Sequence, residues 1–133
     1  MERDVYLGNL KLMGEENGGT LAAANNYANT LLELKRFEEA NALTRKTIPV
    51  ARRVLGEGDT ITLRTRWNHA RALYEDPAAT LDDLHEAVTT LEEIVRTARR
   101  VLGGAHPLTP AFEAHLKWSR AALSARQTPP RSA

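Results

Sequence analysis

Apolar residues recur every three or four positions along most of this chain, which is the spacing of amphipathic helices. The pattern is sustained over five long stretches, at about residues 20–34, 37–55, 60–74, 81–102 and 107–125. A shorter apolar stretch at residues 4–13 precedes them. Segments with glycine or proline separate the stretches, as expected for loops between helices. The pattern therefore predicts an all-α fold.

Three local signals refine the expected helix bounds. Thr20 and Thr80 each stand just before an apolar stretch, where a hydroxyl is suited to cap a helix N-terminus. Pro49 lies inside the stretch 37–55, where it removes one backbone hydrogen bond. Because the apolar pattern continues beyond Pro49, we expect one kinked helix rather than two helices.

One hexamer, Ala-Arg-Arg-Val-Leu-Gly, occurs twice, at residues 51–56 and 98–103. Each copy is typical of a helix end, with cations in the last turn and glycine at the C-cap. Gly14 ends a weaker upstream copy, so that 42 residues separate Gly14 from Gly56 and 47 separate Gly56 from Gly103. The surplus of five residues falls on the turn at residues 76–80. A period of this length indicates stacked supersecondary units.

The repeat divides the chain into five segments. We expect residues 1–13 to be the end helix of a truncated preceding repeat and residues 14–55 and 56–102 to be two repeats. Residues 103–125 would form a terminal capping helix, and residues 126–133, with their proline pair, a disordered tail.

Composition excludes several functions. The 133 residues contain no cysteine, which removes disulfides, zinc-thiolate sites and thiol nucleophiles and favours a reducing, cytoplasmic location. The net charge of +1 gives no reason to expect nucleic acid or a membrane surface as a partner. No apolar run approaches the length of a membrane span, and the charged start lacks the apolar region of a secretory signal.

Several segments resemble tetratricopeptide (TPR) repeats of the kinesin-light-chain type. The matching segments are Asn25-Asn26-Tyr27-Ala28, Arg36-Phe37-Glu38-Glu39-Ala40, the hexamer at 51–56 and the junction Gly103-Gly104-Ala105-His106-Pro107. The second repeat departs from the pattern with Trp67-Asn68, and the third unit lacks the asparagine pair and a partner helix. The resemblance implies a right-handed TPR-like helical-hairpin solenoid of about two and a half repeats.

The resemblance also implies a concave groove lined by the first helix of each repeat, in which a protein or peptide would bind, with a preference for an acidic one. The groove positions map onto Asn25, Asn26, Asn29, Arg64, Trp67, Asn68 and Arg71. Asparagine can pair with a peptide backbone, arginine with carboxylates, and tryptophan is a frequent anchor at interfaces. The alternative is that the polar residues are merely solvated and that Trp67 packs on a neighbouring helix. The third unit offers only Ala111 and His115 where some TPR proteins place a carboxylate clamp, so we expect no clamp.

No enzymatic motif is present. The four histidines stand in no metal-ligand spacing, and we find no nucleophile–base set or phosphate-binding glycine loop, so we expect no catalytic residue, metal or cofactor. The rival to peptide binding is a structural role. Each end of a short solenoid exposes a helix face, which could associate end-to-end as a homodimer or stack on a larger TPR array.

Overall fold

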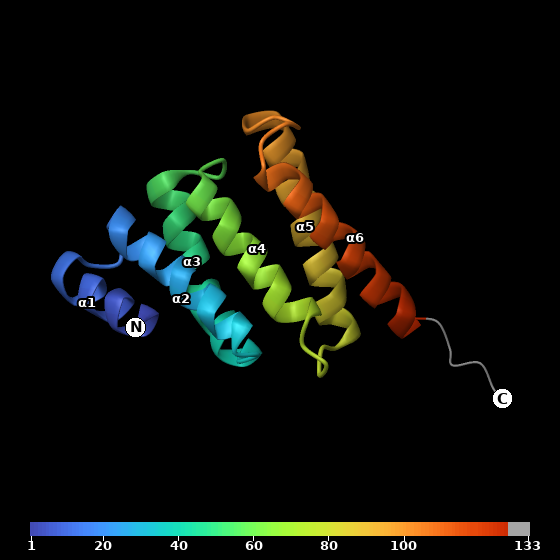
Figure 1. Ribbon diagram of the computed structural model, residues 1–133, viewed down its shortest axis with the longest axis horizontal. Coiled ribbons are helices and arrows are strands. Elements are labelled where there is room, and N and C mark those ends of the chain that lie inside the picture. The colour runs from blue at the N-terminus through green and yellow to red at the C-terminus, as the bar shows by residue number, and fades with distance from the viewer. Residues whose placement is uncertain (128–133) are drawn as a thin grey trace.

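The computed structural model describes residues 1–127, which form six α-helices and no strand. The helices are α1 (Glu2–Met13), α2 (Gly18–Glu33), α3 (Phe37–Leu55), α4 (Thr60–Tyr74), α5 (Leu81–Val101) and α6 (Leu108–Gln127). They follow one another in space in the order of the sequence, from α1 at one end to α6 at the other (Figure 1). The predicted all-α fold is confirmed, with five main helices after one short helix.

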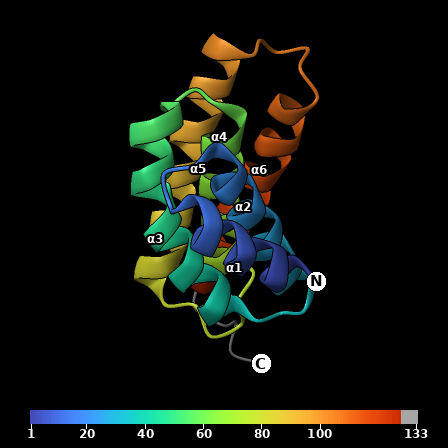
Figure 2. The same cartoon turned by 90° about the vertical axis from the view of Figure 1, so that its left-hand side faces the viewer.

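The helices form two layers built from antiparallel hairpins. The hairpins α2–α3 and α4–α5 each pack internally, α2 also contacts α4, and α4 contacts α6. Figure 2 shows α3 on one side of the molecule and α2 and α6 on the other. The first helices α2, α4 and α6 therefore make one layer, and the second helices α3 and α5 make the other. This is the stacked-hairpin arrangement of an all-α TPR-like helical repeat.

The glycine that follows each repeated helix end is required by the backbone. Gly14, Gly56 and Gly103 have φ of 83°, 94° and 88°, which residues with a Cβ rarely adopt. The Gly56 amide donates to the carbonyl oxygens of Ala51 and Arg52, so that it satisfies acceptors at the end of α3. The helix end predicted from the hexamer is confirmed at α3, where Gly56 is the C-cap; α5 ends one residue earlier than predicted, with Leu102 as its C-cap and Gly103 after it.

The start of α2 differs from the prediction. Asn17 caps the helix: its Oδ1 accepts from the Gly19 amide at 2.8 Å and from the Thr20 amide at 3.3 Å. Gly18 and Gly19 are therefore helical despite their low helix propensity, and Thr20 is a buried residue within the helix. The expected Thr20 cap is wrong because a strong capping residue stands three positions earlier. Thr80 does cap α5, in a capping box with Asp83.

The structure contains α3 as one helix through Pro49, in agreement with the expected span. Pro49 is exposed, so its ring displaces no core side chain. Whether the helix is kinked there stays a prediction.

The core contains the small residues that let paired helices approach closely. Ala28 and Ala70 in the first helices and Ala40 and Ala87 in the second helices are all buried. The apolar stripe of α5 packs in the core from Leu84 to Ala98, but not at its end, where Val101 is 50 % exposed. Val101 is the last residue of α5 and lies beside Gly58, in the loop before α4.

The C-terminal helix is longer than predicted. Residues 126 and 127 belong to α6, although we expected the disordered tail to begin at residue 126. The remainder of that expected tail, residues 128–133, lies outside the described residues.

Candidate functional site

The residues that the sequence suggested for a groove lie together on the layer of first helices. A cavity of about 380 Å³ opens between α2 and α4, next to the start of α6. It is lined by Asn25, Asn26, Asn29, Arg64, Trp67, Asn68 and Leu108. Arg71 does not line the cavity but contacts residues that do. The repeat stacking thus brings the whole predicted set to one place, although the residues come from segments about 40 positions apart.

Two of the asparagines serve the packing of the repeats. The Asn68 side-chain amide donates to Asn25 Oδ1 at 2.8 Å and, more weakly, to the Asn25 carbonyl at 3.4 Å. Both residues are buried, with exposed fractions of 3 % and 8 %. The pair joins α2 to α4 in the lining of the cavity, so these amides are already engaged with each other.

Asn26 holds the same repeat position as Asn68 but has a different environment. The shared position predicts that both face the groove and act together; both line the cavity, but only Asn68 is hydrogen-bonded there. Asn68 reaches back to Asn25 in the preceding first helix, whereas no first helix precedes α2 among the described residues. Asn26 is consequently exposed, and its side chain forms no hydrogen bond within residues 1–127.

Arg71 joins the two walls of the cavity. Its Nη1 donates to Asn29 Oδ1 at 3.3 Å, and its Nε donates to Glu75 at 2.8 Å. Its guanidinium lies 5.6 Å from the centre of the Trp67 ring, a distance at which a cation–π contact is favourable. Arg71 therefore holds Trp67 and Asn29 in place, and its charge is largely balanced by Glu75.

Arg64 is the cation that remains available. It is exposed at the cavity and forms no ion pair or hydrogen bond within the described part of the chain. An unpaired guanidinium at the rim of a cavity can donate two parallel hydrogen bonds to a carboxylate.

Trp67 is fixed against α6. The edge-to-face contacts of its ring are with Phe112, at a centroid distance of 5.4 Å, and with His115, at 5.0 Å. Its indole N–H is buried and has no hydrogen-bond partner in the described residues. Trp67 therefore combines both expected roles, since it packs on a neighbouring helix and also forms a wall of the cavity.

The contribution of α6 to this site was not predicted from the sequence. Leu108 lines the cavity, and the rings of Phe112 and His115 pack against Trp67. The signal was available, because α6 is the first helix of a third unit and must lie beside α4 in a stacked repeat. The sequence interpretation considered residues of α6 only as a possible carboxylate clamp and not as neighbours of Trp67.

His115 carries no positive charge at neutral pH. Burial and the nearby Arg71 guanidinium lower the pKa of His115 to about 4. Its Nδ1 is hydrogen-bonded to the Tyr74 hydroxyl, and burial raises the pKa of that phenol well above its usual value. The neutral imidazole behaves as part of an aromatic cluster, which gives no support to a carboxylate clamp.

A buried chain of hydrogen bonds has the order nucleophile, base and acid. The Thr44 hydroxyl lies 3.2 Å from His69 Nδ1, and His69 Nε2 lies 2.6 Å from Glu86. Thr44 is 0 % exposed, so no substrate can reach its hydroxyl, and burial lowers the pKa of His69. The chain of bonds joins α3, α4 and α5 to one another. Within residues 1–127 no cluster of three or more histidine or acidic side chains could hold a metal ion.

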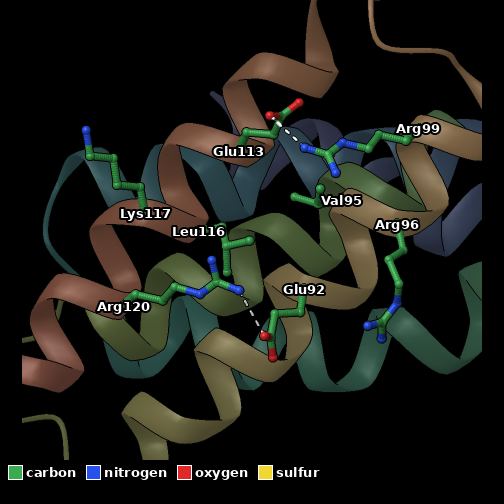
Figure 3. Close-up of a pocket in the computed structure, with 8 residues that line it drawn as sticks. All are labelled: Glu92, Val95, Arg96, Arg99, Glu113, Leu116, Lys117 and Arg120. Carbon is green, nitrogen blue, oxygen red and sulfur yellow. Dashed lines mark hydrogen bonds and ion pairs between the residues drawn. The ribbon is translucent and has the colours of Figure 1, made fainter.

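A second cavity of about 400 Å³ lies at the C-terminal end, between α5 and α6 (Figure 3). Two ion pairs cross it: Arg99 pairs with Glu113, and Arg120 with Glu92, each at 3.0 Å. Figure 3 shows these pairs on either side of Leu116. This is the place where the second helix of a third repeat would pack.

That C-terminal surface is charged where its counterpart inside the solenoid is apolar. Ala70 and Leu73 are buried against α5, whereas the residues 47 positions later are Lys117 and Arg120, which are exposed. Long cationic side chains at these positions hinder close approach of another helix. The surface has the character of a polar end cap, as proposed for residues 103–125.

Comparison with known proteins gives one match. Residues 20–60 match the model of a tetratricopeptide repeat, which covers α2, α3 and the loop that follows. Together with the stacked hairpins, this match makes the chain an all-α, TPR-like helical-repeat protein. Neither the curated proteins nor the solved structures contain a match to the chain. No described helix is sufficiently long and apolar to cross a membrane.

TPR repeats generally mediate protein–protein interaction and are typically not enzymes. The match thus directs attention to the surfaces of the repeats rather than to reaction chemistry. Two surfaces are candidates, the cavity between the first helices and the exposed end helix α1.

Proposed function

We propose that the protein is a non-enzymatic interaction module that binds a peptide or partner helix in the cavity between α2 and α4. The observation that carries the proposal is that residues chosen from the sequence line one cavity in which Asn26 and Arg64 have no partner. If the cavity served only the packing of the repeats, the Asn26 and Arg64 side chains would be hydrogen-bonded within the chain. They are instead free to bind a ligand beside a rigid aromatic wall.

The two walls of the cavity offer different chemistry. Asn26, on α2, carries an amide donor and an acceptor, which suits the backbone of an extended segment. Arg64, on α4, favours a carboxylate, so the preferred ligand is acidic. Trp67 and Leu108 supply an apolar surface for one side chain of that ligand.

The engaged asparagines contribute indirectly. Asn25 and Asn68 set the spacing between α2 and α4, and Arg71 fixes the rotamer of Trp67. A site that is rigid before binding loses less conformational entropy when a ligand is ordered in it. We therefore assign direct contacts to Asn26, Arg64, Trp67 and Leu108, and a supporting role to the other residues.

The kinesin-light-chain type of repeat and a cytoplasmic location remain part of this proposal. The asparagine pair Asn25-Asn26 and the junction at residues 103–107 favour that type of repeat, and the absence of cysteine favours the reducing compartment.

The test is a peptide selected from a random library against the whole chain. Affinity is then measured for Asn26→Ala, Arg64→Ala and Trp67→Phe. The matched control is Arg100→Ala, an exposed arginine on α5, which contributes no residue to the lining of the cavity. We expect each groove variant to bind more weakly by ~1–3 kcal/mol, while the control binds like wild type. Binding to wild type should weaken as salt rises, but less so to Arg64→Ala.

Equal affinity for all four variants would contradict the proposal. A selected peptide would then be binding elsewhere, and the alternative of a self-associating solenoid would gain weight. One feature of the structure favours that alternative independently, and it lies on α1.

A further inference from the structure

The helix α1 has two apolar faces, of which only one is covered. Tyr6 and Leu10 pack on α2, where the Tyr6 ring lies 6.0 Å from the Tyr27 ring. On the other face, Val5 is 53 % exposed and Leu12 is 81 % exposed. Figure 2 shows α1 at the front of the molecule, with its outer side uncovered. A helix that is apolar on both sides is typical of one that is buried on both sides.

The uncovered face has the spacing of a helix–helix seam. Met1, Val5, Gly8 and Leu12 follow one another at intervals of four, three and four residues, which is the alternation of core positions in a coiled coil. The seam lies on the side of α1 opposite to Tyr6 and Leu10. Another helix can therefore pack on it without disturbing the contact with α2.

Gly8 lies in the middle of the seam, and the isolated chain does not require it. It is helical, its φ is negative, and a Cβ added to it would meet nothing within 4 Å. Glycine inside a helix is destabilising relative to alanine, so this residue carries a cost that no contact in the described chain explains. A small residue in a seam allows a second backbone to approach closely.

The charged residues beside the seam can form ion pairs between two antiparallel copies of α1. Asp4 and Lys11 lie on the same flank, both are exposed, and neither forms an ion pair within residues 1–127. When two copies of a helix pair antiparallel, the same flank of each meets the other. In the register that places Val5 over Gly8 of the partner subunit, Asp4 meets Lys11 of the partner subunit, and the two-fold axis repeats the contact.

We propose that α1 pairs antiparallel with α1 of a second copy, forming an isologous homodimer with Val5 over Gly8 of the partner subunit and Asp4 paired with the partner subunit's Lys11. Leu12 then covers Met1 of the partner subunit. An isologous pairing uses the same face of both copies, so the assembly closes as a dimer, and the outward Lys117 and Arg120 disfavour α1 at the C-terminal end. This inference goes beyond the groove and does not depend on it.

The strength of the dimer follows from its size. A helix of 12 residues is ~18 Å long, which is short for an interface of standard area. We therefore expect a weak dimer that dissociates on dilution, in the micromolar to millimolar range.

The experiment is sedimentation equilibrium of the whole chain over a concentration series, with circular dichroism as the check of folding. The wild-type mass should rise from the 14.7 kDa of one chain towards twice that value. Asp4→Lys and Lys11→Asp each place like charges opposite one another twice, so each should weaken self-association at least about tenfold. An equimolar mixture of these two variants restores both pairs, and so does the double variant; each should associate like wild type.

Gly8→Glu is a second probe, because the added side chain points into open space in the single chain but into the seam of the dimer. It should remain folded and monomeric. The proposal is overturned if wild type stays at the mass of one chain throughout, if its mass grows beyond the dimer, or if the mixture of single variants fails to associate. The last two outcomes would point to an open array and to a different register, respectively.

Discussion

The Asn68 side chain, on α4, donates a hydrogen bond of 2.8 Å to the Asn25 side chain, which stands 43 positions earlier on α2. The bond crosses the boundary between two repeats, and both residues are buried. A position predicted from the sequence to contact a ligand is thus also a structural link between neighbouring units. Stability and binding can be separated by experiment at this site.

Removal of the link should destabilise the fold. We expect Asn68→Ala to lower the free energy of unfolding by ~1–3 kcal/mol, because Asn25 then keeps a buried carbonyl oxygen without its donor. Urea denaturation followed by circular dichroism measures the change. Asn26→Ala is the matched control and should stay within about 0.5 kcal/mol of wild type. Equal losses for both variants would show that Asn26 is also bonded.

Stability should decrease in mild acid. The folded protein lowers the pKa of His115 to about 4 and lowers the pKa of His69, both from an ordinary 6.5. Below pH 6.5 the unfolded chain therefore binds protons that the folded chain resists, so stability is full above that pH and declines as pH falls towards about 4. Urea midpoints measured between neutral pH and pH 4 test this. His115→Phe keeps an aromatic ring and should reduce the decline, whereas an unchanged decline would exclude His115 as a cause.

Phe112 fixes α6 to the rest of the molecule. It is 0 % exposed and contacts Trp67, so Phe112→Ala should cost ~3–5 kcal/mol. Trp118, on the same helix, is largely exposed, and Trp118→Ala should cost less than about 1 kcal/mol. Thermal or urea unfolding distinguishes the two. A small effect at Phe112 would mean that α6 packs differently.

The Arg66 guanidinium is buried and joins α4 to α5 through Glu93, with Glu57 at 3.7 Å as a weaker partner. Removal of its nearer partner leaves a buried charge short of a counter-ion. Glu93→Ala should therefore cost ~1–3 kcal/mol, a value limited by the partial exposure of Glu93. Glu57→Ala should cost less, and the reverse order in urea melts would contradict the assignment.

Two glycines should respond in opposite ways to alanine. Gly56 has φ 94° and ψ 162°, a conformation available almost only to glycine, so Gly56→Ala should cost ~1–3 kcal/mol. Gly8 is helical with open space at its Cβ position, and Gly8→Ala should stabilise the isolated chain by ~0.5–1 kcal/mol. Unfolding should be measured at high dilution, so that self-association does not contribute. If Gly8→Ala instead destabilises the isolated chain, the added methyl group meets a neighbour, and the space at Gly8 is not open.

Local signals were sufficient to predict most of the fold. The bounds of α3 and α4 and the cap of α5 follow from the apolar spacing, the hexamer and the Thr80 signal. The start of α2 was misplaced because a weaker capping residue, Thr20, lies closer to the apolar stripe than Asn17 does. The caps of α2 and α5 both depend on which nearby residue caps the helix best, and all the competing residues are visible in the sequence.

The sequence was sufficient to predict which residues belong to the candidate site, but not which of them are free to bind a ligand. A repeat position fixes which helix face a residue occupies, so the groove residues were found together. Which of them are free depends on neighbours that the repeat pattern does not name. Asn68 meets Asn25 because a first helix precedes α4, and Trp67 is held by Phe112 because a first helix follows it. Such pairings depend on side-chain reach between units, which periodicity alone does not determine.

Lys117 and Arg120 stand one unit later at the positions of Ala70 and Leu73. Further repeats can therefore be added more easily at one end of the solenoid than at the other. A designed repeat fused ahead of α1 would meet Val5 and Leu12, which are apolar and ready for burial. A repeat fused after α6 would have to bury two cations, and would need those residues replaced first. Engineered arrays of this unit should therefore lengthen readily from the N-terminal side and stop at the C-terminal side.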